Sequence, residues 1–243
     1  DCSSPLPLWL AYSRTSENQS DIPSQLSLTE TTSIILYMSH HQHTFTELVS
    51  MIEDTNEFWR AWVSKCTYRG RWREIVVRSA LALKLLTFAP TGAILASATF
   101  SLPARIGGPE NWDYRFAWVR DSAFTLYAFI RIGLVDEANA FMNWIEAILK
   151  EAHEIGEPSI RIMYGIHVRD GQNLHDQFEE VILDDFEGYK SSRPVRIGNA
   201  AAYQTQLDIY GELMDSIYLC DKYFNPVSFD LWNCIKALLI EPV

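Results

Sequence analysis

The chain of 243 residues lacks several features that mark whole classes of proteins. Cysteine is scarce, and no Cys-x-x-Cys pair occurs among Cys2, Cys66, Cys220 and Cys234. This excludes a disulfide scaffold, a cysteine-based zinc site and a thioredoxin-like motif, and it favours reduced thiols in a cytosolic protein. Basic charge is also scarce, because 20 Lys and Arg stand against 31 Asp and Glu and the formal net charge is −11. A nucleic-acid surface needs a basic field, so we expect no nucleic-acid partner.

Long apolar runs are missing as well. No run reaches the ~18 residues expected of a membrane span, so the sequence predicts no membrane association. The chain starts at Asp1 without a charged segment followed by an apolar one, so no secretory signal is visible and we expect a cytoplasmic location. The start without Met and the abrupt end at Glu241-Pro242-Val243 both predict an incomplete chain.

The chain does have enough hydrophobic residues to form a buried core. Hydrophobic residues make up 48% of it, with 12 Phe, 11 Tyr and 8 Trp, while charged residues make up only 21%. This composition excludes disorder for most of the chain, and the length allows one or two domains.

Apolar residues recur at helical spacing through the C-terminal two-thirds of the chain. The spacing and the Pro and Gly stop signals predict helices over 53–64, 72–88, 122–133, 136–152, 200–223 and from 227 to the end. Residues 1–30 are rich in Ser, Thr, Pro and Gln and indicate loop, whereas 26–38 carry the β-branched residues typical of one or two strands. Residues 155–198 show little periodicity and predict a long loop.

A cluster of aromatic and charged residues precedes the helix expected from residue 122. It includes Trp112, Asp113, Trp118, Arg120 and Asp121. Aromatic rings cover the apolar faces of sugars, and Asp and Arg hydrogen-bond the hydroxyls, so this mixture suits a sugar site. On composition alone two simpler alternatives are favoured, because caps are commoner than ligand contacts: Asp121 is a helix N-cap, and Arg120 pairs with a nearby acid.

A second cluster, Arg193, Arg196 and Asn199, precedes the helix expected from residue 200. A pair of arginines also suits phosphate, but the acidic segment before it argues against an anionic ligand. Its acids are Asp176, Glu179, Glu180, Asp184, Asp185 and Glu187. A metal site using His167, His175 and these acids is conceivable, yet the spacing fits no tight ligand pattern, and we interpret the acids as a solvated loop. The sequence predicts no metal and no cofactor.

Several stretches, in order along the chain, resemble glycoside hydrolase family 15, the glucoamylase and trehalase-like hydrolases. They are Phe58-Trp59-Arg60, Arg69-Gly70-Arg71-Trp72, Pro90-Thr91-Gly92-Ala93-Ile94, Ser101-Leu102-Pro103, Asn111-Trp112-Asp113-Tyr114-Arg115, Trp118-Val119-Arg120-Asp121, Met163-Tyr164-Gly165-Ile166 and Ser192-Arg193-Pro194-Val195-Arg196-Ile197-Gly198-Asn199. The co-linear order makes the resemblance more specific than any one motif.

The resemblance implies a mainly α fold: a partial (α/α) toroid of long helices with elaborate loops, preceded by a short β remnant. Residues 1–45 would be the remnant of an N-terminal β-sandwich, 46–70 a connector and 71–243 the first part of the catalytic toroid. It also implies hydrolysis of an α-glucosidic bond, with inversion, at a non-reducing glucose. Glucan and trehalose substrates are not separated by these motifs, and the oligomeric state is not indicated.

The resemblance further implies a set of substrate-binding residues. They are Trp118, Arg120 and Asp121 at the terminal glucose, Arg193, Arg196 and Asn199 on a second loop, and Trp112 and Asp113 with a less defined role. The general acid and base of the family are expected beyond Val243, so we expect residues 1–243 to be inactive alone. Two other readings stay open: a catalytically dead carbohydrate-binding or regulatory relative, and a helical repeat protein without a ligand.

Overall fold

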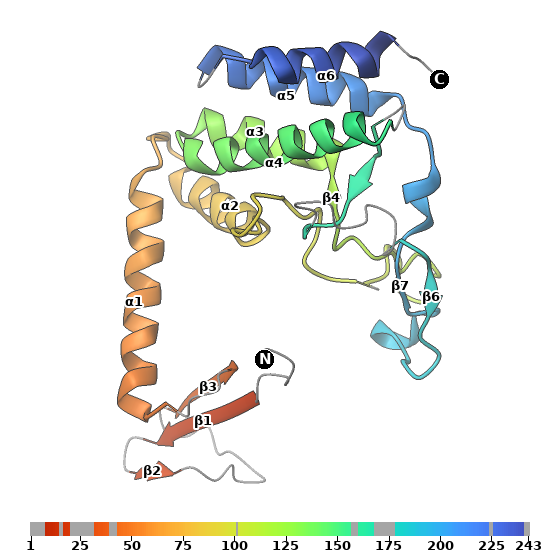
Figure 1. Ribbon diagram of the computed structural model, residues 1–243. Helices are drawn as coiled ribbons and strands as arrows, with labels where there is room; N and C mark the ends of the chain where they lie inside the picture. The colour runs from red at the N-terminus through yellow and green to blue at the C-terminus, as the bar shows by residue number, and fades with distance from the viewer. Residues whose placement is uncertain are drawn as a thin grey trace, which may run out of the picture. The chain divides into compact units, whose positions relative to one another are not determined.

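The structure is a computed structural model that describes residues 8–14, 17–19, 32–38, 43–100, 102–156, 160–167, 178–223 and 226–240. The described chain is mainly helical with a short β segment first, which confirms the predicted fold class (Figure 1). It divides into two compact units, residues 1–64 and 65–243, and each is described by itself. Within the described ranges, no helix combines the length and apolar composition that crossing a membrane requires.

The first unit contains a small antiparallel sheet in the order β2–β1–β3. Its strands are β1 (Leu8–Arg14), β2 (Glu17–Gln19) and β3 (Thr32–Met38). The strand expected within 26–38 is confirmed for 32–38, and residues 20–31 lie outside the described part. The loop expected over 1–30 is wrong for 8–14, because that segment pairs with β3 along its whole length, from Leu8 opposite Met38 to Arg14 opposite Thr32.

Helix α1 (Phe45–Ser64) follows this sheet and begins eight residues before the expected start at residue 53. A reciprocal cap explains the earlier start. The hydroxyl of Thr44 accepts from the backbone N–H of Glu47 at 3.3 Å, and the Glu47 carboxylate accepts from the N–H of Thr44 at 2.7 Å. This capping box satisfies two backbone donors that the first helical turn leaves without a helical partner.

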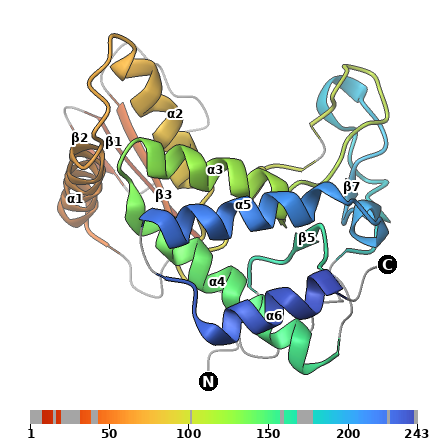
Figure 2. The same ribbon diagram turned by 90° about the horizontal axis from the view of Figure 1, so that it is seen from above.

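The described residues of the second unit form five α-helices. They are α2 (Arg73–Leu85), α3 (Val119–Arg131), α4 (Val135–Glu154), α5 (Asp208–Tyr223) and α6 (Phe229–Ile240). Helix α3 lies against α4 and α5, and α4 also lies against α6 (Figure 2). The apolar stripes that the sequence predicted meet here, and residues such as Leu126, Phe129, Ile145 and Leu149 are completely buried.

The helix expected from residue 200 is wrong at its start, because α5 begins only at Asp208. Residues Ala200–Tyr203 form a short 3₁₀ helix whose cap is Asn199, and the Asn199 side chain accepts from the N–H of Ala201 at 3.0 Å. The chain then runs without helical structure until α5. Helices α2, α3, α4 and α6 begin within a few residues of the expected positions.

The long loop expected over 155–198 contains only short regular pieces in its described part. β5 (Met163–Tyr164) pairs with β4 (Ala117–Trp118), and β6 (Val181–Ile182) pairs with β7 (Arg196–Ile197). Each pairing joins segments from distant parts of the chain, and the β4–β5 pair lies at the start of α3 (Figure 1). The candidate site lies among them.

Candidate functional site

Three segments form what we call the wall: residues 112–116, 178–182 and 196–199. The backbone N–H of Asn199 donates to the carbonyl of Phe178 at 2.9 Å, and Asn111 on the flank of the wall donates through its side chain to the carbonyl of Pro194 at 3.1 Å. Extended segments present successive side chains to opposite faces. Neighbouring residues of the wall accordingly line two different clefts.

The aromatic cleft, on one face of the wall, has a volume of about 300 Å³. It is lined by Trp112, Tyr114, Trp118, Glu180, Arg196, Asn199, Ala200, Ala201 and Gln204. Trp118 is buried, and the ring centroids of Tyr114 and Trp118 are 6.1 Å apart. Within the described residues the buried indole N–H of Trp118 has no hydrogen-bond partner.

The polar side of the aromatic cleft centres on Arg196. Its guanidinium lies 4.7 Å from the centroid of the Trp112 ring and donates to the Glu180 carboxylate at 3.1 Å. Glu180 also accepts from the backbone N–H of Ala200 at 3.3 Å. Glu180 is therefore part of the cleft, and its assignment to a solvated acidic loop was wrong. Glu180 and Arg196 are sixteen residues apart in the sequence, so no local pattern predicts their pairing.

Arg120 lies beside the aromatic cleft, 5.7 Å from the centroid of the Trp118 ring. Its guanidinium donates to the side-chain oxygen of Gln206 at 2.9 Å and to the carboxylate of Asp208 at 2.7 Å. The hydrogen bond from Arg120 lowers the pKa of Asp208 below its ordinary value. Arg120 therefore does pair with an acid, and the pairing joins the first turns of α3 and α5. Its role at a sugar stays a prediction.

Asp121 is exposed in the first turn of α3. The N-cap of this helix is Trp118, so the capping alternative for Asp121 is wrong. In the part of the chain that the structure describes, the Asp121 carboxylate makes no hydrogen bond or ion pair. Its negative charge is one of the influences that raise the pKa of Arg120, after the hydrogen bond from Arg120 to Asp208.

Arg193 does not line the aromatic cleft. It is exposed at a third cleft of about 370 Å³, which is lined by Ile182, Leu183, Asp184, Phe186, Arg193, Pro194 and Val195. Of the second sequence cluster, the structure therefore brings Arg196 and Asn199 to Trp118 and places Arg193 elsewhere. The peptide bond between Arg193 and Pro194 is cis.

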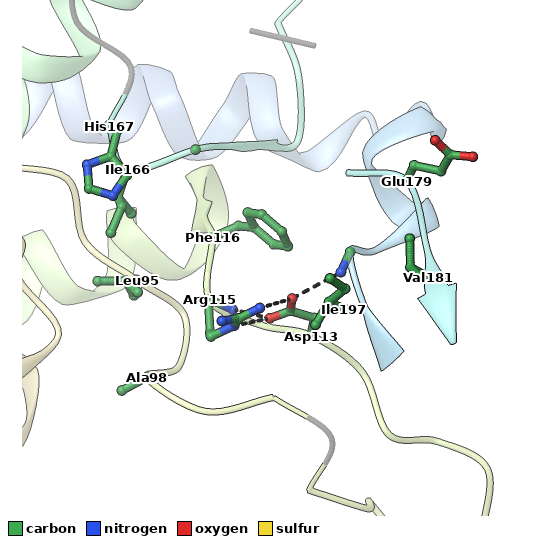
Figure 3. A pocket seen from close by; sticks show the side chains of 12 residues that line it. Leu95, Ala98, Asp113, Arg115, Phe116, Ile166, His167, Glu179, Val181 and Ile197 are labelled. Carbon is green, nitrogen blue, oxygen red and sulfur yellow. Dashed lines mark hydrogen bonds and ion pairs between the residues drawn. The ribbon is translucent and has the colours of Figure 1, made fainter. Parts of the chain in front are cut away.

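Asp113 faces the other side of the wall, at what we call the Asp113 cleft (Figure 3). This cleft has a volume of about 620 Å³, and its lining includes Arg115, Phe116, His167 and Glu179. The Asp113 carboxylate is completely buried, which opposes its ionisation. Hydrogen bonds from Arg115 and from the backbone of Gly198 outweigh that opposition and hold the pKa of Asp113 below its ordinary value.

Sequence reasoning missed several residues of this region, namely Tyr114, Arg115, Gln204, Gln206 and Asp208. Tyr114 has a visible signal, because it stands two residues after Trp112 in a segment that proves extended. Among the described residues, no group of three or more His, Cys, Asp and Glu side chains is placed to hold a metal ion. His175, which entered the metal alternative, lies outside the described part.

The chain is similar in sequence to proteins of a known family. The profile of one family, described as Glycosyl hydrolases family 15, matches residues 70–240. A trehalase of Thermoplasma acidophilum is 40% identical over 210 residues, which are 86% of this chain and 34% of that relative. A trehalase of Mycolicibacterium smegmatis is 38% identical over 221 residues, which are 89% of this chain and 32% of that relative.

A protein named Trehalase 1, of Sulfolobus acidocaldarius, is 39% identical over 171 residues, which are 69% of this chain and 29% of that relative. The chain thus spans about a third of the length of the curated relatives it matches. No solved structure matches the chain significantly.

Proposed function

The chain belongs to glycosyl hydrolase family 15, and we propose that the whole protein cleaves an α-glucosidic bond at a non-reducing glucose, with inversion. The aromatic cleft of this chain holds that glucose. Trehalose is the substrate we favour, because the similar curated proteins carry the name trehalase. A glucan cut in the manner of a glucoamylase is the second choice.

The observation that carries this proposal is the composition of the aromatic cleft. Three aromatic rings and a polar set of Arg196, Asn199 and Glu180 converge on one hollow of about 300 Å³. A hollow of this size lies at the lower end of the range for small-ligand sites. Rings cover the apolar faces of a hexose, and forked donors and amides bind its hydroxyl edges.

In this proposal Trp118 and Trp112 contact the sugar ring, while Arg196 and Asn199 bind hydroxyls. Arg120 and Asp121 act at the rim beside Trp118. Arg193, which lines another cleft, acts on a part of the substrate beyond the non-reducing glucose. Inversion needs two carboxyls about 6.5–9.5 Å apart. We assign neither to a residue of this chain, and the inactivity of residues 1–243 alone stays a prediction.

A fluorescence titration tests the binding role. Glucose and trehalose are titrated against the protein, and the tryptophan emission is followed in the wild type, in Trp118→Ala and in Trp72→Ala. Trp72 is 52% exposed and does not line the aromatic cleft, so it is the matched control. We expect a saturable change that Trp118→Ala weakens at least ~30-fold, the size of a buried aromatic hot spot, and that Trp72→Ala leaves unchanged.

The catalytic role is tested on the whole protein by following glucose release from trehalose with NMR. Inversion predicts one β-glucose and one α-glucose per trehalose in the first turnovers. Saturable binding without glucose release would favour the catalytically inactive, carbohydrate-binding alternative. Absence of both binding and release would sink the proposal. The cytoplasmic location expected from the sequence also stays a prediction.

A further inference from the structure

Asp113 is held through both its side chain and its backbone. Its carboxylate accepts from the Nε of Arg115 at 2.9 Å, from the Nη2 of Arg115 at 2.8 Å and from the backbone N–H of Gly198 at 3.1 Å. Its backbone carbonyl accepts from the side-chain amide of Asn199 at 3.0 Å. One residue therefore ties segment 112–116 to segment 196–199 through both its side chain and its backbone.

We propose that Asp113 is a positioning residue: it fixes the segment 196–199 so that Arg196 and Asn199 face the aromatic cleft, and it does not itself contact the sugar. The inference rests on the proposed sugar-binding role of that cleft. It assigns Asp113 a different role from direct substrate binding. The reason is that the carboxylate has no exposed surface and its oxygens already accept hydrogen bonds from protein groups.

The position of Gly198 shows how the restraint reaches the cleft. Gly198 has φ +79°, and a Cβ at this position would collide with the backbone carbonyl of Glu179. The glycine thus lies directly against the Glu179–Glu180 peptide while its N–H is held by Asp113. Only Ile197 separates Gly198 from Arg196. The contact at Gly198 therefore also fixes the register of the β6–β7 pair, and that register places the Arg196 guanidinium beside the Glu180 carboxylate.

Arg115 explains why this position needs a carboxylate and not a neutral amide. Its guanidinium forms two parallel hydrogen bonds with Asp113, and it lies 4.4 Å from the centroid of the Phe100 ring. Charge-assisted, two-point bonds of this kind fix direction as well as distance. An amide in place of the carboxylate would offer one acceptor and would present a donor to groups that are donors themselves.

The first test needs no ligand, so its outcome is independent of the proposed function. Amide hydrogen exchange is measured at residues 196–201 in the wild type, in Asp113→Asn and in Asp136→Asn. Asp136 is the matched control, because its ion pair with Lys65 is also 2.8 Å long but is exposed. We expect exchange at Gly198 to become at least ~10-fold faster in Asp113→Asn only, since a bond to a charged group is lost. Unchanged exchange there overturns the proposal.

The second test separates positioning from a general loss of stability. Glucose affinity is measured in a double-mutant cycle of Asp113→Asn and Arg196→Ala. We expect Asp113→Asn to weaken binding ~10-fold in the wild-type background and clearly less, ~3-fold, in the Arg196→Ala background, because the part of the restraint that acts through Arg196 is then absent while the part that acts through Asn199 remains. Equal losses in both backgrounds overturn the proposal.

A gentler variant keeps both tests decisive if Asp113→Asn does not fold. Arg115→Lys retains the positive charge beside Asp113 and removes the two-point geometry. We expect it to speed exchange at Gly198 and to show the same coupling with Arg196→Ala, with smaller factors. Wild-type exchange and affinity in Arg115→Lys would overturn the proposal. If the wild type binds no sugar but exchange at Gly198 still speeds up in the variants, the proposed sugar-binding function is rejected. The positioning of segment 196–199 by Asp113 is then still supported.

Discussion

The two faces of the wall differ in how fully their polar groups are paired. On the side of the Asp113 cleft, the buried carboxylate accepts from Arg115 and Gly198. On the side of the aromatic cleft, the buried indole N–H of Trp118 has no partner within the described residues. Buried donors are normally satisfied, so an unpaired one calls for an explanation. The Asp113 side is therefore the supporting face of the wall, and the aromatic side, where an indole donor has no protein partner within the described residues, is the proposed ligand face.

The substitution Gly198→Ala should break the supporting face most severely. The new methyl group would meet the Glu179 carbonyl at a backbone angle that side chains rarely adopt, so we expect a loss of at least ~2 kcal/mol of unfolding free energy and loss of glucose binding. Gly107→Ala is the control, because Gly107 has φ +78° but open space around the added Cβ. Equal losses of unfolding free energy in the two variants would show that the close approach at Gly198 is unimportant.

The second largest effect on the supporting face is expected from low pH. The pKa of Asp113 is lower in the folded than in the unfolded chain, so the unfolded state binds more protons between the two values. The contribution of this carboxylate is therefore complete above the ordinary pKa of about 3.9 and is lost as pH falls through the lowered value. Denaturant unfolding measured from pH 7 to pH 2 checks this: stability should fall less steeply below pH 4 in Asp113→Asn than in the wild type.

On the ligand face, Glu180→Gln should change binding more than folding. The variant removes the charge that orients Arg196, whose side chain is 13% exposed against 25% for Glu180. We expect glucose affinity to fall ~3-fold to 10-fold and the unfolding free energy to fall by about 1 kcal/mol, as for a partly buried pair. Calorimetric titration and a thermal melt of the same sample measure both. A large loss of unfolding free energy with unchanged glucose affinity would show that Glu180 stabilises the wall and does not contribute to binding.

The smallest effect is expected at the rim. Asp208→Asn removes the charged partner of Arg120, but this pair is well exposed, with exposed fractions of 36% and 43%. Exposed pairs contribute little, so the melting temperature should change by less than ~2 °C. Arg120 retains Gln206 as an acceptor, so its place beside Trp118 should persist. A large drop in melting temperature would mean that the rim belongs to the support.

The sequence predicted the helices better than the site. Apolar spacing located α3 and α4 because their buried stripes are local in sequence, whereas β1 needed its distant partner β3 to be recognised. The clusters around Trp118 and Arg196 were found, since aromatic and basic residues close together are visible in any one segment. The role of Glu180 and the separate location of Arg193 were not predicted. Both depend on how segments far apart in the sequence pair with one another in the wall.

The hydrogen bond between Asp113 and Gly198 also bears on the order of folding, because it joins residues 85 positions apart. Helices α3 and α4 follow each other directly and pack together, so their contacts close only a short loop. Closing a loop of 85 residues costs more chain entropy, and non-local contacts form after local ones have restricted the chain. The helical pair should therefore form first, and the two clefts should exist only once the segment ending at Asn199 has arrived.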